Sequence, residues 1–428
     1  MKKQIHVQDQ VFWYLQRGKI LPCTQDMHAD VVIIGGGMAG LAAAQAWHAR
    51  GKKVVLLEQY YCGSGASGKS SGFITQNAEL SLTDFFHKYG PQGGMTIWKA
   101  FSAGVQDIKN NIKNNNFACG YEAQDTLIIA DSAKAMASLQ VEHENLKKMG
   151  YATKFYDQQT IKSQVASDGY FGGIVYENTF GIDGYRYCQE LKNLLQSQGV
   201  VIFEETPVLE INDHAVITAH AKITADYIVV CTDRFTPELG LLTKEVSHVQ
   251  TFLMMSQVLS DEQVQMIFPD KKLMVWDTQT IYNYFRITAD NRMLVGGSDF
   301  SSTYADYARH DYDPIVQKLT NYIAQKFPEL TIQFEQTWPG MIGISKDISP
   351  IAGVDKDRPY LFYVAACAGL PIAAALGRYS AEHLIDGSND LADYFSPYRK
   401  FPISGVAQSI LGNKLSFLIS HLIKKNIP

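Results

Sequence analysis

Residues 30–58 alternate between apolar and glycine-rich segments in an order that predicts strand, turn, helix and strand. The first segment, residues 31–34, is a continuous run of Val and Ile, which is typical of a parallel strand buried on both faces. An alanine-rich stretch over residues 41–48 predicts a helix, and the apolar residues 54–57 predict a second strand. The pattern therefore predicts a βαβ unit at the start of an α/β fold.

Three glycines stand between the first strand and the helix in the spacing G-x-G-x-x-G. Gly35 permits the sharp turn, Gly37 lets the backbone approach a pyrophosphate, and Gly40 lets the helix pack closely on the strand. The helix N-terminus offers unpaired N–H groups to phosphates. Glu58, at the end of the second strand, can accept hydrogen bonds from a ribose diol, and its charge disfavours the 2′-phosphate of NADP. The alternative is an ordinary βαβ unit without a ligand, but here the full context of a dinucleotide fingerprint is present.

The fingerprint alone fits both FAD and NAD. It lies near the N-terminus of a long chain, and the sequence contains no second G-x-G-x-x-G for a separate nicotinamide cofactor. Both features favour FAD. The next segment, residues 59–74, is rich in Gly and Ser, and such a loop can wrap backbone amides and hydroxyls around a diphosphate or a ring edge. A flexible surface loop is the alternative.

Further along the chain, the hydrophobic pattern predicts a helix over residues 184–198 and short strands over 200–203 and 227–230. Alternation in residues 282–287 and 293–295 indicates a sheet-rich region over 241–335. Residues 402–425 have apolar side chains at helical spacing. They predict an amphipathic helix that packs on the body or on a partner subunit, or that lies on a membrane surface.

Composition narrows the class of protein. The chain has 428 residues, of which 46% are hydrophobic, so disorder and a small disulfide scaffold are excluded. The net charge of −5 gives no overall basic surplus for binding nucleic acid. Six scattered cysteines without a CxxC pair fit a reducing compartment, and neither a signal peptide nor an apolar run of about 18 residues is visible. We therefore expect a cytoplasmic protein, with contact at the inner membrane face left open for its tail.

Residues 30–58 and the segment GSGASGKSSGFI (63–74) resemble the opening of the D-amino-acid-oxidase-type family of FAD-dependent oxidoreductases, in particular its gamma-glutamylputrescine oxidoreductase-like and glycine oxidase-like members. The resemblance continues in residues 282–299, 338–354 and 361–385. It departs at Cys367-Ala368-Gly369-Leu370-Pro371, where the family usually reads Gly-x-x-Gly-His-Gly or similar. Lys69 also replaces the usual Arg, so the positive charge is kept without two-point phosphate contact.

The resemblance implies a cofactor and a site. FAD is expected to be non-covalent, because Gly340 stands near the position where the sarcosine-oxidase branch has its attachment cysteine. Val208 is expected to give its backbone to the adenine, and Thr232 to close over the flavin. The expected cofactor-binding residues are Gly35, Gly37, Gly40, Glu58, Ser67, Lys69, Gly72, Val208, Thr232, Gly343, Gly369 and Leu370.

The family's chemistry implies oxidation of a small-molecule amine or amino acid, with hydride transfer to flavin N5 and hydrolysis of the resulting imine. Arg286 is the candidate for holding a substrate carboxylate, since its planar fork suits one, and a structural ion pair is its alternative. Tyr284 and Tyr282 are candidates for the pocket wall or for simple sheet packing. His248 is a candidate for facing the flavin or for a structural hydrogen bond. No HExxH, GxSxG or P-loop motif supports other chemistry.

Two other functions stay open: a flavoenzyme for hydroxy acids or tRNA modification, and a flavin-binding partner subunit that has lost catalysis. The predicted fold is α/β, with an FAD-binding Rossmann-like domain interleaved with a sheet-rich α+β substrate domain. The first domain is predicted over residues 28–90, 150–240 and 336–390, the second over 91–149 and 241–335, and the amphipathic tail over 391–428.

Overall fold

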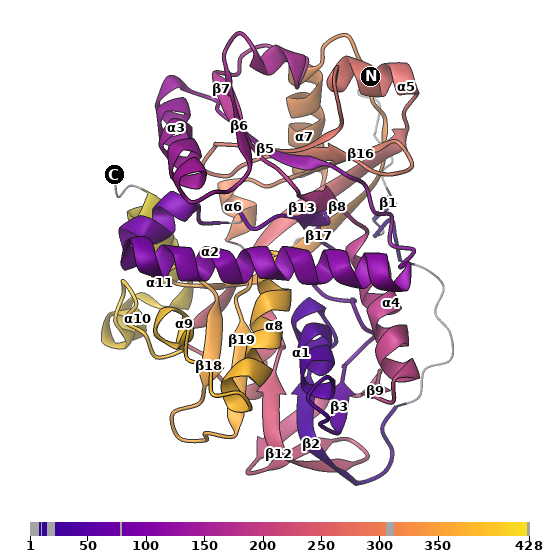
Figure 1. The fold of residues 1–428 in the computed structure, drawn as a ribbon, viewed down its shortest axis with the longest axis vertical. Coiled ribbons are helices and arrows are strands. Elements are labelled where there is room, and N and C mark those ends of the chain that lie inside the picture. Colours follow the sequence, from indigo (N-terminus) through magenta and orange to yellow (C-terminus); the bar gives the residue numbers. More distant parts are fainter. Residues whose placement is uncertain (1–7, 10, 15–21, 78, 305–311, 426–428) are drawn as a thin grey trace.

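The computed structural model describes residues 8–9, 11–14, 22–77, 79–304 and 312–425. Two large sheets form the centre of the fold (Figure 1). The first sheet has eight strands. They are β2 (Met27–Ile34), β3 (Val54–Leu57), β9 (Val201–Phe203), β10 (Val208–Asn212), β11 (Ala215–Thr218), β12 (Lys222–Val230), β18 (Ile351–Val354) and β19 (Leu361–Ala365).

The centre of this sheet is parallel, in the order β9-β3-β2-β12-β19. Chain order reverses between β2 and β12, so their carboxyl ends lie at the switch point where open α/β sheets bind ligands. The register places Ile34 beside Leu57 on one side and beside Val230 on the other. The turns that follow these three strands therefore meet at one edge of the sheet.

The second sheet has nine strands in the order β1-β17-β13-β16-β15-β14-β5-β7-β6, and most neighbours are antiparallel. The strands are β1 (Gln8–Asp9), β5 (Asp125–Ile129), β6 (Thr153–Asp157), β7 (Gly172–Tyr176), β13 (Val246–Val258), β14 (Leu273–Asp277), β15 (Tyr284–Ile287), β16 (Arg292–Gly297) and β17 (Phe334–Ser345). A separate antiparallel pair joins β4 (Phe73–Ile74) to β8 (Phe180–Gly181).

Helices cover both sheets, and one long helix crosses between them. Helix α2 (Leu82–Asn115) spans the middle of the view in Figure 1, with the nine-stranded sheet above it and the parallel sheet below. Gly104 brings it close to α8, because a Cβ there would lie 2.1 Å from the Pro371 carbonyl oxygen. The other helices are α1 (Met38–His48), α3 (Ala133–Lys148), α4 (Gly184–Ser197), α5 (Asp261–Ile267), α6 (Phe300–Thr303), α7 (Asp313–Lys326), α8 (Leu370–Leu384), α9 (Ala392–Phe395), α10 (Gly405–Leu411) and α11 (Asn413–Lys425), with 3-10 turns at Ile161–Ser163 and Asp233–Leu239.

The predicted α/β class is confirmed. Helix α4 and strand β9 match the predicted helix 184–198 and strand 200–203 to within one residue, and β12 contains the predicted strand 227–230. Two of the predicted boundaries differ from the strand pairing. Strands β6 and β7 follow residue 150 but belong to the nine-stranded sheet, because β7 pairs with β5. Strand β17 extends that sheet to Ser345, past the boundary at residue 336. The division into two domains stays a proposal, with these three strands assigned to the second.

The C-terminal tail forms two helices, α10 and α11, rather than one. Phe417 and His421 are buried, whereas Val406 is 77% exposed and Ile410 is 82% exposed. The tail therefore packs on the body along one face, as the plainer of the predictions has it. Residues 426–428 and the side chains of residues 422–425 lie outside the described part of the chain.

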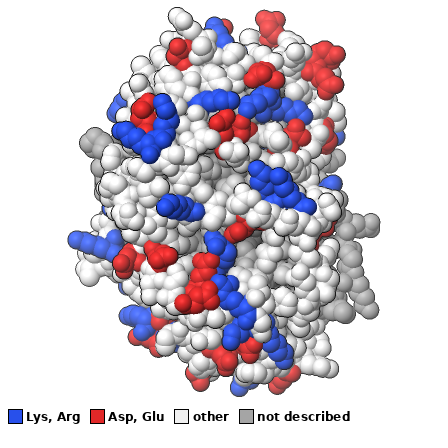
Figure 2. Space-filling model, viewed as in Figure 1, with Lys and Arg blue, Asp and Glu red and all other residues white. Residues whose placement is uncertain are grey.

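Charges on the face drawn in Figure 2 are mixed, with Lys and Arg interspersed among Asp and Glu rather than gathered into one large patch of either sign. Among the described residues, no helix is long and apolar enough to cross a membrane.

Candidate functional site

A cavity of about 820 Å³ lies where the switch point of the parallel sheet faces the nine-stranded sheet. Its wall is shared between the two. Gly35, Gly37 and Glu58 come from the parallel sheet and its turns, and Thr251 and Tyr284 come from the nine-stranded sheet. A volume of this size is typical of cofactor and small-molecule sites.

The glycine turn has the tight geometry that its sequence predicts. Gly35 has a φ of +106°, and a Cβ there would lie 2.5 Å from the carbonyl oxygen of Cys231. Gly37 caps α1 and lines the cavity, so no side chain separates the helix N-terminus from a ligand. Gly40 does not line the cavity. A Cβ at Gly40 would lie 1.8 Å from the Gly35 carbonyl oxygen, so this glycine serves the close packing of the helix on the strand.

Glu58 directly follows β3 at the edge of the cavity and is only 8% exposed. Its Oε2 accepts a hydrogen bond from the N–H of Gly36 at 2.7 Å, and its Oε1 accepts one from the N–H of Tyr60 at 2.8 Å. Burial raises the pKa of the Glu58 carboxyl, and the two backbone donors oppose that shift. Each oxygen keeps acceptor capacity, so the carboxylate is held in place to receive two neighbouring hydroxyl groups.

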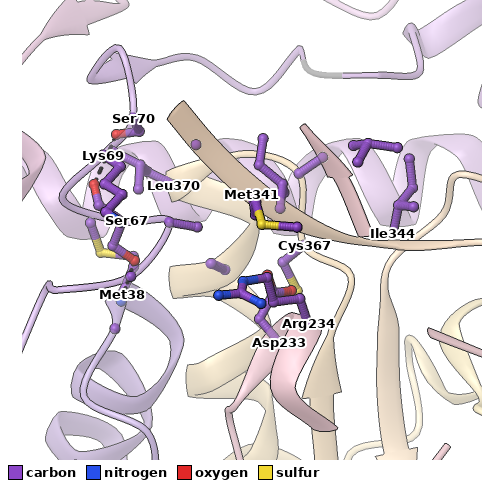
Figure 3. A pocket seen from close by; sticks show the side chains of 18 of the residues that line it. Met38, Ser67, Lys69, Ser70, Asp233, Arg234, Met341, Ile344, Cys367 and Leu370 are labelled. Carbon is purple, nitrogen blue, oxygen red and sulfur yellow. Dashed lines mark hydrogen bonds between the residues drawn. The ribbon is translucent and has the colours of Figure 1, made fainter. Parts of the chain in front are cut away.

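The Gly- and Ser-rich loop is held by specific contacts rather than left free on the surface. The side chain of Trp13 donates to the carbonyl of Gly68, and that of Trp338 donates to the carbonyl of Lys69 at 3.1 Å. Ser67 accepts a hydrogen bond from the N–H of Met38 at 2.9 Å, which ties the loop to the start of α1. Figure 3 shows Ser67, Lys69 and Ser70 beside Met38 and Leu370, where Ser67 and Lys69 line the cavity.

A second helix N-terminus, that of α8, closes the cavity. Gly369 precedes α8 with a φ of +135° and no side-chain cap, so the first N–H groups of this helix are open to a ligand. Gly369 and Leu370 both line the cavity, as do Thr232, Gly72 and Val208. The departure from Gly-His in this loop therefore leaves the helix end itself in place.

Gly343 is a predicted cofactor residue that does not line the cavity. Its N–H donates to Oδ2 of Asp233 at 2.7 Å, and Oδ1 of Asp233 accepts from the N–H of Ala366 at 3.0 Å. A Cβ at Gly343 would lie 2.4 Å from the same carboxylate. The glycine therefore lets Asp233, which lines the cavity, join β17 to the β19–α8 turn, and Figure 3 draws Asp233 and Arg234 below Met341 and Cys367.

The three predicted catalytic residues do not come together. Tyr284 lines the cavity, whereas His248 and Arg286 do not. Arg286 is 1% exposed, and it donates from Nε to the Ser71 carbonyl at 2.8 Å and from Nη2 to the Ile182 carbonyl at 2.7 Å. Burial lowers its pKa to about 10. The guanidinium thus lies under Gly72, behind the wall, and this position disfavours the prediction that it meets a substrate carboxylate.

His248 also lies away from the cavity. It pairs with Gly343 in the ladder between β13 and β17, while the neighbouring Val249 and Gln250 line the cavity. This position also disfavours the prediction that His248 faces the flavin.

Other side chains of the cavity escaped the sequence analysis. They include Glu79, Trp276, Tyr304, Arg234 and His421. Trp276 on β14 pairs with Tyr284 on β15. Because Tyr284 was predicted, the strand beside it could have been searched for further aromatic residues. Glu79 and His421 carry no local signal, because one lies in a short loop and the other comes from the C-terminal helix. Among the residues that the structure describes, no group of three or more His, Cys, Asp or Glu could hold a metal ion.

These residues fit FAD. Two helix N-termini suit phosphate and a ring edge, the glycines leave room for close approach, and Glu58 suits a ribose diol. The family model for FAD dependent oxidoreductases (DAO) matches residues 30–383 of the chain. This match confirms the family that the motifs of the sequence resemble.

Two curated relatives match most of the chain. "Probable oxidoreductase OrdL" of Haemophilus influenzae is 26% identical over 385 residues, which cover 87% of this chain and 86% of that protein. Gamma-glutamylputrescine oxidoreductase of Escherichia coli is 25% identical over 391 residues, which cover 89% of each.

A solved structure of glycine oxidase from Geobacillus kaustophilus shares the fold, with a TM-score of 0.73 at 18% identity over 87% of this chain and 99% of that one. The family model covers the glycine turn, the Gly- and Ser-rich loop and residues 338–354, and the geometry of the cavity agrees with this match. The chain therefore belongs to the family of FAD-dependent oxidoreductases, and FAD is its cofactor.

Proposed function

We propose that this protein oxidises a small-molecule amine or amino acid at the carbon beside the nitrogen. The observation that carries the proposal is the continuity of the cavity, in which the nucleotide-binding features share one space with Tyr284 and Trp276 of the nine-stranded sheet. Its relatives include a gamma-glutamylputrescine oxidoreductase and glycine oxidases, and the second name specifies an amino acid. Both names favour a nitrogen-bearing substrate over a hydroxy acid.

In this proposal, the α1 N-terminus with Gly35 and Gly37 holds the pyrophosphate, Glu58 holds the ribose, and the backbone of Val208 meets the adenine. Bound FAD supplies the acceptor, flavin N5, for a hydride from the C–H bond beside nitrogen, and the product imine is hydrolysed by water. We expect the attachment to be non-covalent, since Gly340 lines the cavity where a linking cysteine would be needed. The flavin end is assigned to Ser67, Lys69, Gly72, Thr232, Gly369 and Leu370.

The chain's own part at the substrate end is to bind, orient and exclude water. Burial raises the pKa of Tyr284 to about 12, so its hydroxyl stays protonated at neutral pH. That hydroxyl lies 3.2 Å from the hydroxyl of Thr251, and it can donate to a substrate heteroatom. No protein base is required when the amine arrives neutral, so the absence of a catalytic triad motif from the sequence does not weaken the proposal.

The experiment is an anaerobic titration of the purified protein, followed by its flavin absorbance. Amines or amino acids should bleach the visible band, and acid should release free FAD from the protein. Bleaching by hydroxy acids alone would overturn the substrate class. An unchanged band across a broad panel of amines and amino acids would instead favour the flavin-binding partner subunit.

Location stays a prediction. All six cysteines are free, which agrees with a reducing compartment. The exposed Val406 and Ile410 support contact of residues 402–425 with a membrane surface, whereas the buried Phe417 supports packing on the body. Flotation of the protein with anionic vesicles tests this contact, with Ile410→Asp as the variant that should stay unbound if the tail mediates it.

A further inference from the structure

A carboxylate stands at the substrate side of the cavity without a positive partner of its own. Glu79 lies between β4 and α2, lines the cavity and is half-buried. Its Oε1 accepts a hydrogen bond from the hydroxyl of Tyr282 at 2.6 Å. Among the described residues, no Lys or Arg forms an ion pair with Glu79, whereas the half-buried Glu122 and Glu204 each pair with a lysine. A half-buried carboxylate with one neutral donor retains strong affinity for a cation.

A row of aromatic rings in the cavity wall continues from Tyr282, the hydrogen-bond partner of this carboxylate. Tyr282 lies 5.9 Å from Tyr284 and 6.3 Å from Trp276 between ring centroids, and Phe73 stacks on Trp276 at 5.3 Å. All four rings line the cavity. Burial, with the Glu79 charge next, raises the pKa of Tyr282 well above its usual value, so this phenol remains a neutral donor. Aromatic faces attract cations, and a cage of such rings is the common protein site for ammonium groups.

The positive side chains of the cavity have other positions. Lys69 lies beside Ser67 and Leu370, near the start of α1, and Arg234 lies beside Asp233 below Met341 (Figure 3). Arg234 also stacks on Phe235, with its guanidinium carbon 3.7 Å from the ring centroid. Arg286 is turned behind the wall, toward the carbonyls of Ser71 and Ile182. The charge at the aromatic end is therefore set by Glu79.

We propose that Glu79, with the rings of Trp276, Tyr282 and Tyr284, forms a subsite for a second, cationic nitrogen of the substrate. The substrate class is thus a diamine or another amine that carries a distal ammonium group. The proposal rests on the proposed amine oxidation. The subsite is assigned to a second nitrogen because a carboxylate beside the reacting amine would keep that amine protonated, and a protonated amine cannot lose a hydride from its neighbouring carbon.

The first test compares three amines of equal chain length that differ only at the far end: diaminobutane, butylamine and aminobutanoate. In anaerobic flavin reduction, the half-saturating concentration should be lowest for the diamine, by about tenfold. Glu79→Gln should remove that preference, while the exposed Glu329→Gln, which removes the same charge elsewhere, should keep it. Equal use of the diamine and butylamine by the wild-type protein would overturn the subsite. Reduction by none of the amines would instead count against amine oxidation itself.

The second test does not depend on turnover. Tetramethylammonium has no N–H bond and serves as a binding probe in calorimetry of the FAD-loaded protein. It should bind the wild-type protein about tenfold more tightly than Glu79→Gln, and Trp276→Leu should weaken it further. Tetramethylammonium that binds both proteins equally, or neither, would contradict the subsite whatever the flavin titration gives.

Discussion

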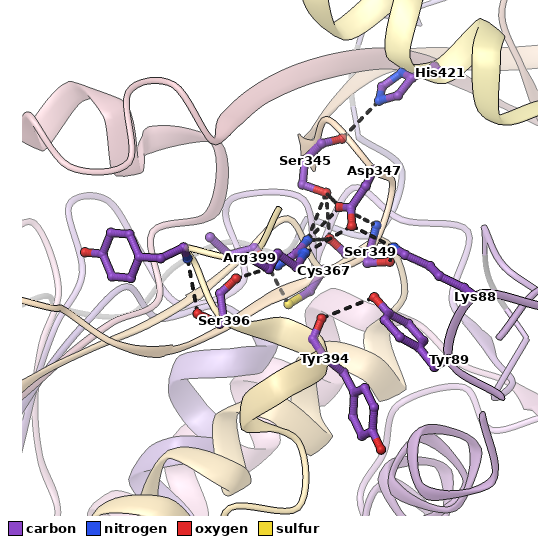
Figure 4. A network of polar contacts seen from close by, with 12 residues as sticks. Lys88, Tyr89, Ser345, Asp347, Ser349, Cys367, Tyr394, Ser396, Arg399 and His421 are labelled. Carbon is purple, nitrogen blue, oxygen red and sulfur yellow. Dashed lines mark hydrogen bonds and ion pairs between the residues drawn. The ribbon is translucent and has the colours of Figure 1, made fainter. Parts of the chain in front are cut away.

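Asp347 and Arg399 form a buried two-point ion pair, in which Nη2 of Arg399 lies 2.7 Å from Oδ1 and Nε lies 3.0 Å from Oδ2 (Figure 4). Lys88 of α2 donates to Oδ2 at 2.6 Å, and the hydroxyl of Ser345 donates to Oδ1 at 2.8 Å. The carboxylate thus joins the end of β17 to α2 and to the segment after α9. This aspartate lies within residues 338–354, where the sequence resembles the family, and the structure gives it a role in joining elements.

We expect Asp347→Asn to lower the free energy of unfolding by about 3 kcal/mol, because removal of one partner leaves buried positive charge uncompensated. Denaturant unfolding of the two proteins measures the difference. Asp357→Asn is the matched control, since the Asp357 side chain is 79% exposed, and it should change stability by less than about 0.5 kcal/mol. Equal stability of Asp347→Asn and the wild-type protein would refute the role of the pair.

The ionised state of Asp347 predicts that its contribution to stability depends on pH. Burial opposes ionisation of Asp347, but the hydrogen bonds and charges of Arg399 and Lys88 outweigh it and hold its pKa well below the usual range. A depressed folded-state pKa contributes stability that is present above about pH 4, the pKa in the unfolded chain, and is lost as pH falls below it. The stability gap between wild type and Asp347→Asn should therefore narrow from pH 5 toward pH 3, by up to about 1.4 kcal/mol per pH unit. A gap that stays constant over that range would contradict this assignment.

Glu58 was predictable, and its contribution to cofactor affinity can be measured. We expect Glu58→Ala to weaken FAD binding about tenfold or more, because the ribose loses a charged acceptor that the backbone holds in place. Titration of the apoprotein with FAD, followed by quenching of flavin fluorescence, gives the affinity. Glu210→Ala on the exposed side of β10 removes an equal charge and should leave affinity unchanged. An affinity loss that is the same in both variants would point to general electrostatics instead.

Gly35, Gly37 and Glu58 line the cavity as predicted, whereas Arg286 lies behind its wall, and the two outcomes have a common explanation. The fingerprint is local, since its turn, helix and second strand follow one another within residues 30–58, so their spacing fixes their geometry. Arg286 takes its position from carbonyl groups that are 215 and 104 residues away in the chain, at Ser71 and Ile182. A motif cannot report such partners, because any buried arginine on a strand has the same local pattern.

The predicted boundary at residue 150 differs from the strand pairing for a related reason. The apolar residues of β7 identify a strand but not its neighbour, and its pairing with β5 depends on the whole sheet. Glu79 escaped notice because a lone acid in a short loop is usually solvated, and only the fold places it against Tyr282. Local sequence patterns thus predict the glycine turn and Glu58 at the cavity wall, whereas the other end of the cavity depends on contacts between distant segments.

A substitution of Arg286 can separate two interpretations of this residue: a ligand of a substrate carboxylate, or a structural residue that holds two carbonyls. We expect Arg286→Lys to lower the free energy of unfolding by about 2 kcal/mol, because lysine keeps the charge but not the fork that reaches two carbonyls. The ratio of KM values for an amino acid and for the matching amine should not change. Steady-state kinetics with such a pair of substrates checks this, and a selective rise in KM for the amino acid would restore the role of a carboxylate ligand.

The C-terminal helix α11 supplies part of the cavity wall, which predicts that packing in the tail matters to the site. Phe417 is 2% exposed and packs on Ile344 and Ile348, and His421 donates from Nε2 to the Ser345 carbonyl at 3.0 Å. We expect Phe417→Ala to cost about 3–5 kcal/mol of unfolding free energy, since the helix cannot fill the space of the lost ring.

Ile410→Ser is the matched control for the tail. Ile410 is 82% exposed on α10, so its replacement should change stability by no more than about 0.5 kcal/mol. Denaturant unfolding of both variants measures the effect, and the FAD affinity of each reports whether the cavity wall has loosened with the helix. A loss below about 1 kcal/mol for Phe417→Ala would mean that α11 does not pack on the body in solution, and the exposed apolar side chains of α10 would then belong to a larger unpacked surface.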